Sequence, residues 1–332
     1  MNKFVIFGSE SKYNELIFNN PVVKNSRYIG ERVHIENWIL RLLNKIHCSK
    51  KINTLVNLPF KQIWSKFYFK DYFDSDVDVF IFFANRDYLV KQGYWKYLKR
   101  KYPKAKFVLY FRDLVSGYKT LDIQFYKDNF DLLITYDDED AAKFNIIRSP
   151  DVYVAVKSIL STLDGKKSTD VFFVGKAKNR LDTILYFFEY FRERGITTDF
   201  SIIGVPEGKR KYEDEINYSR KLPYLEVLQR IMNCNCILDI IQEGSKGFTL
   251  RIFESIVYNK RLITNNTNLR ESYLYDSANM RVVEDSDSID TEFIRNRETV
   301  SYDDRLKERL SLEHFLQFIE EKLKLSETSL GG

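Results

Sequence analysis

The chain has 332 residues, of which 44% are hydrophobic and 15% aromatic, with 26 Phe and 22 Tyr against six Pro and 13 Gly. This length exceeds that of a typical single domain and suits two, and the composition excludes a disordered protein. The 52 basic and 47 acidic residues leave a net charge of +5, a surplus too small to indicate a nucleic-acid-binding protein.

The cysteines and the hydrophobic runs predict where the protein resides. Only Cys48, Cys234 and Cys236 are present, an odd number without the spacing of a disulfide framework, which indicates a reducing compartment. No apolar run is long enough for a signal-peptide core or a membrane span, so we expect a cytoplasmic protein. Cys234 and Cys236 are too close for a usual zinc pair, and the three histidines do not cluster with them, so no metal site is predicted.

The first half of the chain alternates short apolar runs with helical patterns. Strands are expected at residues 4–7, 52–56, 77–83, 107–111 and 132–135, and helices around 38–46, 88–102 and 138–145. Asp137 and Asp138 are suited to cap the last of these helices. Strands and helices alternating at this spacing predict a doubly wound α/β domain.

A polar, turn-rich stretch at residues 152–170 is the expected linker, and a second alternating series follows it. Strands are expected at residues 171–174, 200–203, 237–241 and 261–264, and helices at 179–194, 225–232, 248–259 and 303–325. We assign residues 1–157 to an acceptor-side domain, 158–310 to a donor domain, and 311–332 to a C-terminal helix that packs back on the body and ends in a frayed tail.

The most informative stretch is residues 236–266, which has the pattern of a strand, a glycine loop, a helix and a strand. Gly244 and Gly247 allow backbone torsions that other residues resist. The helix is apolar almost all round, yet Arg251 and Glu254 share one stripe of it. A polar stripe on a buried helix must be satisfied, either by an internal Arg251–Glu254 ion pair or by a ligand. The loop before the helix offers N–H groups to a phosphate, and Glu254 could accept ribose hydroxyls, which together describe a nucleotide.

Residues 247–264, Gly-Phe-Thr-Leu-Arg-Ile-Phe-Glu-Ser-Ile-Val-Tyr-Asn-Lys-Arg-Leu-Ile-Thr, resemble the donor-binding segment of GT-B glycosyltransferases. The resemblance is closest to bacterial enzymes of lipopolysaccharide and capsular polysaccharide synthesis. It implies two Rossmann-like domains facing a central cleft, with the donor between them. It also implies that Glu254 holds the ribose, and that phosphate or sugar is contacted by Gly244, Gly247, Phe248 and Thr249.

Further donor contacts are expected where other strands of the second domain end. Gly175, Lys176 and Arg180 follow the strand at 171–174, where the two cations would neutralise a diphosphate. They could equally be exposed residues at a helix start. Gly204 follows the next strand, where the resemblance implies backbone contact with the base; the alternative is a simple turn.

Glycosyl transfer with inversion also needs a base for the acceptor hydroxyl, which the family takes from the first domain. The candidates are Asp113, Glu10 and His34, all at strand ends or early loops. Asp113 could instead form a surface pair with Arg112. The Asp pairs at residues 74–78 precede a strand, whereas a metal pair should follow one, so metal-independent transfer without a cofactor is expected.

The leading hypothesis is thus a glycosyltransferase that moves a sugar from a nucleotide donor to a surface glycan. A nucleotide-sugar epimerase or hydrolase on the same fold and a non-catalytic nucleotide-binding subunit are the alternatives. A nicotinamide dehydrogenase is disfavoured because no Gly-x-Gly-x-x-Gly follows a strand. The run from Trp95 to Lys106 mixes aromatics and cations without an acid, which suits an anionic membrane surface and peripheral attachment, or else a solvated helix end.

Overall fold

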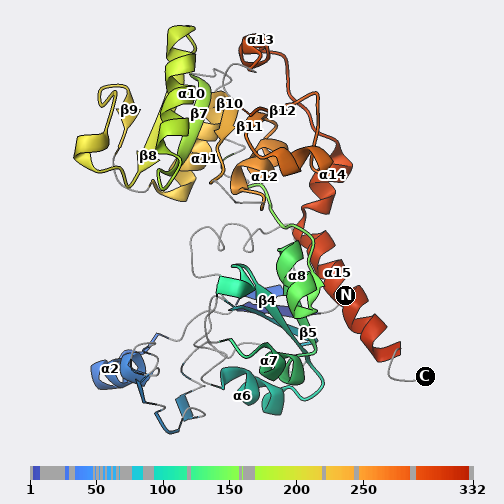
Figure 1. Cartoon of the computed structure of the whole chain (residues 1–332). Helices are drawn as coiled ribbons and strands as arrows, with labels where there is room; N and C mark the ends of the chain where they lie inside the picture. The colour runs from blue at the N-terminus through green and yellow to red at the C-terminus, as the bar shows by residue number, and fades with distance from the viewer. Residues whose placement is uncertain are drawn as a thin grey trace. The chain divides into compact units, whose positions relative to one another are not determined.

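The computed structural model divides the chain into two compact units (Figure 1). Unit 1 comprises Met1–Asp151 and Phe315–Gly332, and unit 2 comprises Val152–His314, whereas the sequence suggested boundaries at 157 and 311. The structure describes residues 3–7, 27–29, 34–47, 49, 52, 55–56, 58–60, 63–64, 67, 77–84, 93–117, 121–156, 159, 169–218, 222–242, 247–284 and 289–328. No helix within these ranges is both long and apolar enough to cross a bilayer.

Unit 1 is built on a parallel sheet with the order β2-β1-β3-β4-β5-β6. Its strands are β1 (Phe4–Phe7), β2 (Arg27–Ile29), β3 (Val79–Phe83), β4 (Lys106–Phe111), β5 (Leu132–Thr135) and β6 (Ile147–Arg148). Its helices are α2 (Trp38–His47), α6 (Tyr94–Lys101), α7 (Ile123–Asn129), α8 (Asp138–Phe144) and the 3-10 turn η2 (Val115–Gly117). Strands β1, β3 and β5 are buried along their whole length, as the continuous apolar runs predict for a parallel sheet covered on both faces.

Aromatic rings fill the core of unit 1. Phe7 stacks on Phe82 with ring centroids 4.9 Å apart, and Phe80 stacks on Phe107 at 5.2 Å. The caps of α8 also follow the sequence prediction, since the Asp137 side chain accepts from the Asp140 N–H at 2.8 Å. The expected doubly wound α/β organisation is therefore present in this unit.

Unit 2 contains a second parallel sheet, with the order β12-β11-β10-β7-β8-β9. Its strands are β7 (Thr169–Lys176), β8 (Thr198–Ile203), β9 (Ile216–Asn217), β10 (Cys234–Asp239), β11 (Arg261–Thr264) and β12 (Met280–Val282). Its helices are α10 (Leu181–Glu193), α11 (Tyr224–Asn233), α12 (Leu250–Val257), α13 (Thr291–Arg295) and α14 (Asp304–Arg309), with 3-10 turns η3 (Glu207–Lys209) and η4 (Thr267–Glu271). The chain runs outward from β7 in one direction through β8 and β9, and then returns to its other side through β10, so the strand order reverses between β7 and β10.

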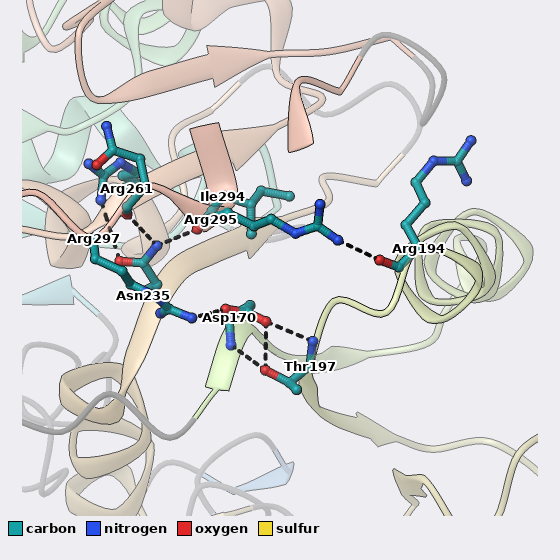
Figure 2. Close-up of polar contacts among 9 residues, drawn as sticks. Asp170, Arg194, Thr197, Asn235, Arg261, Ile294, Arg295 and Arg297 are labelled. Atoms are coloured by element: carbon teal, nitrogen blue, oxygen red, sulfur yellow. Dashed lines mark hydrogen bonds and ion pairs between the residues drawn. The ribbon is translucent and has the colours of Figure 1, made fainter. Parts of the chain in front are cut away.

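Polar side chains form hydrogen bonds and an ion pair at the amino-terminal ends of strands in this second sheet (Figure 2). Asp170, near the start of β7, accepts from the Thr197 N–H at 2.8 Å and from its hydroxyl at 2.7 Å, and it also pairs with Arg297. Asn235, fully buried in β10, donates to the carbonyls of Ile294 and Asn296. Residues at and just after the end of α13 are thereby fixed to the starts of β7 and β10.

Two predicted elements differ from the structure, and the short strands β2, β6, β9 and β12 and the helices α7 and α13 were not predicted. Residues 52–56 were expected to form a strand, but Ile52 and Leu55 are helical, and the Val56 N–H donates to the Ile52 carbonyl at 2.8 Å. Leu55 is 86% exposed, so this stretch does not occupy the buried environment that a parallel strand requires. Its β-branched composition misled the prediction because tertiary context overrides β-propensity.

The last predicted helix, at residues 303–325, is interrupted. It consists of α14 and of α15 (Leu312–Thr328), which belongs to unit 1 from Phe315 on. Between them Leu310 is fully buried and its carbonyl accepts from the Tyr153 N–H at 2.9 Å, while the Ser311 hydroxyl accepts from the His314 N–H at 3.1 Å. The serine thus caps a new helix where the amphipathic pattern alone suggested continuity. Within unit 1, Phe315 packs on Tyr110 with ring centroids 5.2 Å apart.

Two of the three aromatic residues in the run from Trp95 to Lys106 are not available to a membrane. Trp95 and Tyr102 are buried, together with Leu98, and pack in the core of unit 1. Lys96 lies over the Trp95 ring at 5.2 Å, and Lys99 donates to the Asn129 carbonyl. The segment therefore presents cations and the half-buried Tyr97, but neither Trp95 nor Tyr102, which corrects most of the aromatic part of the sequence interpretation.

Candidate functional site

The carboxyl ends of β7, β8, β10 and β11 share one edge of the unit 2 sheet because all four strands are parallel. The strand order reverses between β7 and β10, and in open α/β sheets ligands bind beyond the carboxyl ends at such a reversal. The residues directly after these two strands are therefore the first candidates for a binding site.

Arg180 spans this reversal point. Its Nε donates to the Lys176 carbonyl at the end of β7 at 3.1 Å, and its Nη1 donates to the Ile240 carbonyl just after β10. A Cβ atom added to Gly175 would lie 2.8 Å from Nη2 of Arg180, so the glycine makes room for the guanidinium. Burial lowers the pKa of Arg180, while the negative charge of Asp239 acts to raise it. The cation is thus held half-buried at the sheet edge, where it could meet an anion.

Asp239, the last residue of β10, connects three elements at the same edge. One carboxylate oxygen accepts from the Thr249 hydroxyl at 2.9 Å and the other from the Thr264 hydroxyl at 3.0 Å. Thr249 is the N-cap of α12 and also accepts from the Arg251 N–H at 3.2 Å. Burial raises the pKa of Asp239, while the two hydroxyls oppose the shift. The side chain fixes the start of α12 relative to β10 and β11.

Glu254 lies one turn into α12 and is completely buried. Its Oε1 accepts from the Tyr224 hydroxyl at 2.8 Å, and its Oε2 lies 2.7 Å from Nη1 of Arg251. Of the two alternatives that the sequence left open, the structure has the internal Arg251–Glu254 ion pair. The two paired atoms are close in distance but are not aligned as a hydrogen bond, so the attraction between them is electrostatic rather than directional.

The electrostatics of Glu254 reflect this burial. Desolvation raises the pKa of Glu254 from 4.5 to about 7, although the charge of Arg251 and the Tyr224 hydrogen bond act against the shift. Tyr224 continues the network to Tyr153, with the two hydroxyl oxygens 2.6 Å apart. A carboxyl group that titrates near neutrality beside a half-buried helix start is the kind of perturbed group that functional sites contain.

The structure agrees with the other predicted donor residues to different degrees. Lys176, the last residue of β7, is exposed, and Gly204, just after β8, has a φ of 79°, a conformation that favours glycine. Phe248 is half-buried. Gly247 is not left-handed, and nothing lies within 4 Å of the position that a Cβ atom would take, so its predicted need for special torsions is not found. Gly244 lies outside the described residues.

The candidate bases belong to unit 1, and the structure shows less about their surroundings. Asp113 is exposed, two residues after β4, and His34 is exposed before α2, while Glu10 lies outside the described residues. The Arg112 guanidinium stacks over the rings of Phe83 and Tyr110, at 5.2 and 5.9 Å. The turn that follows Asp113 is held by Asp140, whose buried carboxylate accepts from the N–H groups of Val115 and Ser116.

Two residues of the site were missed by the sequence reasoning about function. Asp239 interrupts an apolar strand, a signal that was visible, and it interacts electrostatically with Arg180, Arg251 and Glu254. Asn266 is fully buried, donates to the Gly247 carbonyl at 3.1 Å, and has no hydrogen-bond partner for its Oδ1 within the described part of the chain. Nothing in the sequence distinguishes Asn266 from the neighbouring Asn265.

No protein-family model matches the sequence, and no curated protein matches it. Two solved structures are similar in fold. One is an alpha-glucosyltransferase in complex with UDP and a 13-mer DNA containing a central A:G mismatch, with 12% identity over 93% of this chain and 90% of that chain and a TM-score of 0.49. The other is the glycotransferase of kitacinnamycin, with 9% identity over 97% of this chain and 99% of that chain and a TM-score of 0.43.

Proposed function

We propose that the protein is a glycosyltransferase that uses a nucleotide sugar as its donor. The observation that carries the proposal is the position of Arg180, whose guanidinium spans β7 and β10 against the space left by Gly175. The helix that carries Glu254 starts from the same edge, tied to it by Asp239. A cation for the diphosphate and a carboxylate for the ribose fit the resemblance of residues 247–264 to a GT-B donor segment.

The binding mode requires one exchange of partners at Glu254. Both carboxylate oxygens already have a neighbour, so a ribose hydroxyl would replace Arg251 at Oε2, where no hydrogen bond is lost. Arg251 retains 13% exposure of its side chain and can turn toward the donor phosphates as it leaves. The resemblance also assigns phosphate or sugar contacts to Phe248 and Thr249 at the start of α12.

In the transfer step the acceptor oxygen forms a bond to the anomeric carbon while the bond from that carbon to the diphosphate oxygen breaks. The acceptor proton passes to a base of unit 1, for which Asp113, Glu10 and His34 are the candidates in an inverting reaction. Arg180 and Lys176 would stabilise the charge that develops on the departing diphosphate. We propose metal-independent transfer to a lipopolysaccharide or capsule acceptor at the cytoplasmic membrane face, on the basis of the sequence resemblance.

The test is calorimetric titration of the purified protein with UDP, GDP, CMP and their sugars, comparing Arg180→Ala with the parent. Arg180→Ala should weaken binding of the preferred nucleotide roughly tenfold to a hundredfold, the effect of losing a charge-assisted contact. Arg192→Ala is the matched control, because Arg192 is an exposed arginine of α10 paired with Glu215. Equal affinities for the parent and Arg180→Ala would refute the proposed donor site.

The same preparation separates the alternative functions. An epimerase or hydrolase would consume the nucleotide sugar without any acceptor. A non-catalytic subunit would bind nucleotide but transfer no sugar, and no carboxylate of unit 1 would be essential to it. Transfer that requires an acceptor and is lost in Asp113→Asn would support both the reaction and this candidate base.

A further inference from the structure

Helix α2 of unit 1 (blue in Figure 1) presents its apolar stripe to solvent. Trp38, Leu42 and Ile46 follow one another at intervals of four residues, and Ile39 and Leu43 lie beside them on the same face. Trp38 is 70% exposed and Leu42 50% exposed. An amphipathic helix of a globular domain normally buries this face, whereas here its apolar side chains are exposed.

The helix contacts described residues of its own unit at its C-terminal end. His47 is buried and stacks on the Trp64 ring with centroids 5.3 Å apart, and Trp64 in turn lies 5.6 Å from Phe67. His47 is four residues after Leu43, so it lies about 40° around the helix from that residue, at one margin of the apolar stripe. The rest of the stripe is not covered by this contact, since its side chains are between 39% and 70% exposed.

The following segment also exposes large apolar side chains. Leu55, Val56, Phe60 and Ile63 are all more than half exposed. Residues 38–63 provide ten of the sixteen large hydrophobic side chains that are exposed among the described residues. Isolated exposed apolar residues are ordinary on a protein surface, but a concentration of this kind marks an interaction site.

The charge of the same segment indicates the partner. Residues 37–70 contain seven cations and no acidic residue, although basic and acidic residues are nearly balanced in the chain as a whole. The cations are Arg41, Lys45, Lys50, Lys51, Lys61, Lys66 and Lys70. In α2, Arg41 and Lys45 are exposed and four residues apart, on the flank of the Trp38–Leu42 row. A second copy of this chain would oppose these cations with its own, which disfavours self-association.

We infer that α2, together with the exposed side chains of Leu55, Val56, Phe60 and Ile63, forms a docking surface for an anionic phospholipid bilayer, with α2 lying in the interface. Trp and aliphatic side chains along one face with cations on its flank are the composition of helices that insert shallowly into the headgroup region. The bilayer supplies hydrocarbon for the stripe and negative headgroups for the cations. This surface is distinct from the run of Trp95 to Lys106, in which Trp95 and Tyr102 are buried.

The inference goes beyond the proposed function, and its test does not depend on transferase activity. The full chain is sedimented with vesicles of phosphatidylcholine alone and with an equimolar mixture of phosphatidylcholine and phosphatidylglycerol. Binding is expected with the mixed vesicles only and should weaken as salt is raised. Emission from exposed Trp38 should shift to the blue on binding, and this shift should be absent in Trp38→Phe while sedimentation persists.

Substitutions on the surface give the decisive comparison. Trp38→Ser/Leu42→Ser should lower the vesicle partition coefficient by about tenfold or more, because apolar area no longer leaves water. The matched control is Tyr186→Ser/Ile147→Ser, which removes exposed apolar side chains outside this surface. Lys45→Glu should lower partitioning by about tenfold, and Lys143→Glu, an exposed lysine of α8, should have a smaller effect.

The inference is overturned if the parent does not bind mixed vesicles, or if Trp38→Ser/Leu42→Ser binds as well as the parent. It is also overturned if light scattering shows a dimer that Trp38→Ser/Leu42→Ser converts to a monomer, since the surface would then join two copies of the chain. Because the substituted side chains are exposed, the melting temperature should stay near that of the parent. Nucleotide titration of the same variants shows separately whether the donor site is intact.

Discussion

Replacement of Glu254 by glutamine should change how the stability of the protein depends on pH. Burial raises the pKa of Glu254 from 4.5 to about 7 in the folded protein. The folded state therefore holds this proton more tightly than the unfolded chain does. The contribution of the group to stability is fully present below pH 4.5 and is lost as the pH rises through 7.

The size of the effect follows from the shift. One pKa unit corresponds to about 1.4 kcal/mol, so the shift corresponds to roughly 3 kcal/mol of unfolding free energy. Glutamine keeps the shape and the acceptor for the Tyr224 hydroxyl, but it does not titrate. The stability of the parent relative to Glu254→Gln should therefore fall by roughly 3 kcal/mol between about pH 4 and about pH 8.

The assay is urea unfolding at several pH values, followed by circular dichroism for the whole chain and by tryptophan fluorescence for unit 1. The three tryptophans, Trp38, Trp64 and Trp95, all belong to unit 1, so fluorescence separates its transition from that of unit 2. Glu226→Gln, which removes a carboxylate from a surface pair with Arg230, controls for loss of a negative charge. A stability difference between parent and Glu254→Gln that is constant over this pH range, or that grows with pH, would refute the reasoning.

Two further predictions concern the two edges of the unit 2 sheet. Gly175→Ala should displace the Arg180 guanidinium, because the new Cβ would lie 2.8 Å from Nη2. Nucleotide binding should weaken by about threefold to tenfold, and the free energy of unfolding should fall by less than about 1 kcal/mol. An affinity equal to that of the parent in the titration would contradict this prediction. Asn235→Ala should lower the unfolding free energy by about 3 kcal/mol in urea titration, because it leaves the Ile294 and Asn296 carbonyls without their buried donor, yet it should not change nucleotide affinity. A loss below about 1 kcal/mol would show that these carbonyls find other donors.

Local sequence determined the longer strands and most of the helices of both units, whereas the short strands β2, β6, β9 and β12 were not predicted. The apolar runs at residues 4–7 and 132–134 match strands β1 and β5, because a strand buried on both faces needs mostly apolar residues. Residues 261–264 match β11, although Arg261 and Thr264 at its two ends are polar. Asp137 marked the start of α8 because a short side-chain acceptor satisfies the free N–H groups of a first turn. The interruption before α15 was not predicted, since the amphipathic pattern is continuous and only the buried Leu310 and the capping Ser311 divide it.

The candidate site was located by sequence but was defined only by tertiary packing. The sequence showed that Arg251 and Glu254 lie on one stripe of the helix. Their ion pair, however, is accompanied by complete burial of the Glu254 carboxylate and by a hydrogen bond from Tyr224, which lies thirty residues earlier in the chain. Arg180 was proposed for a diphosphate, but its position across β7 and β10 follows from the strand order. Composition likewise showed that α2 is amphipathic without showing which face meets solvent. Periodicity is a property of neighbouring residues and is set by sequence, while burial and partner choice are set by segments distant in the chain.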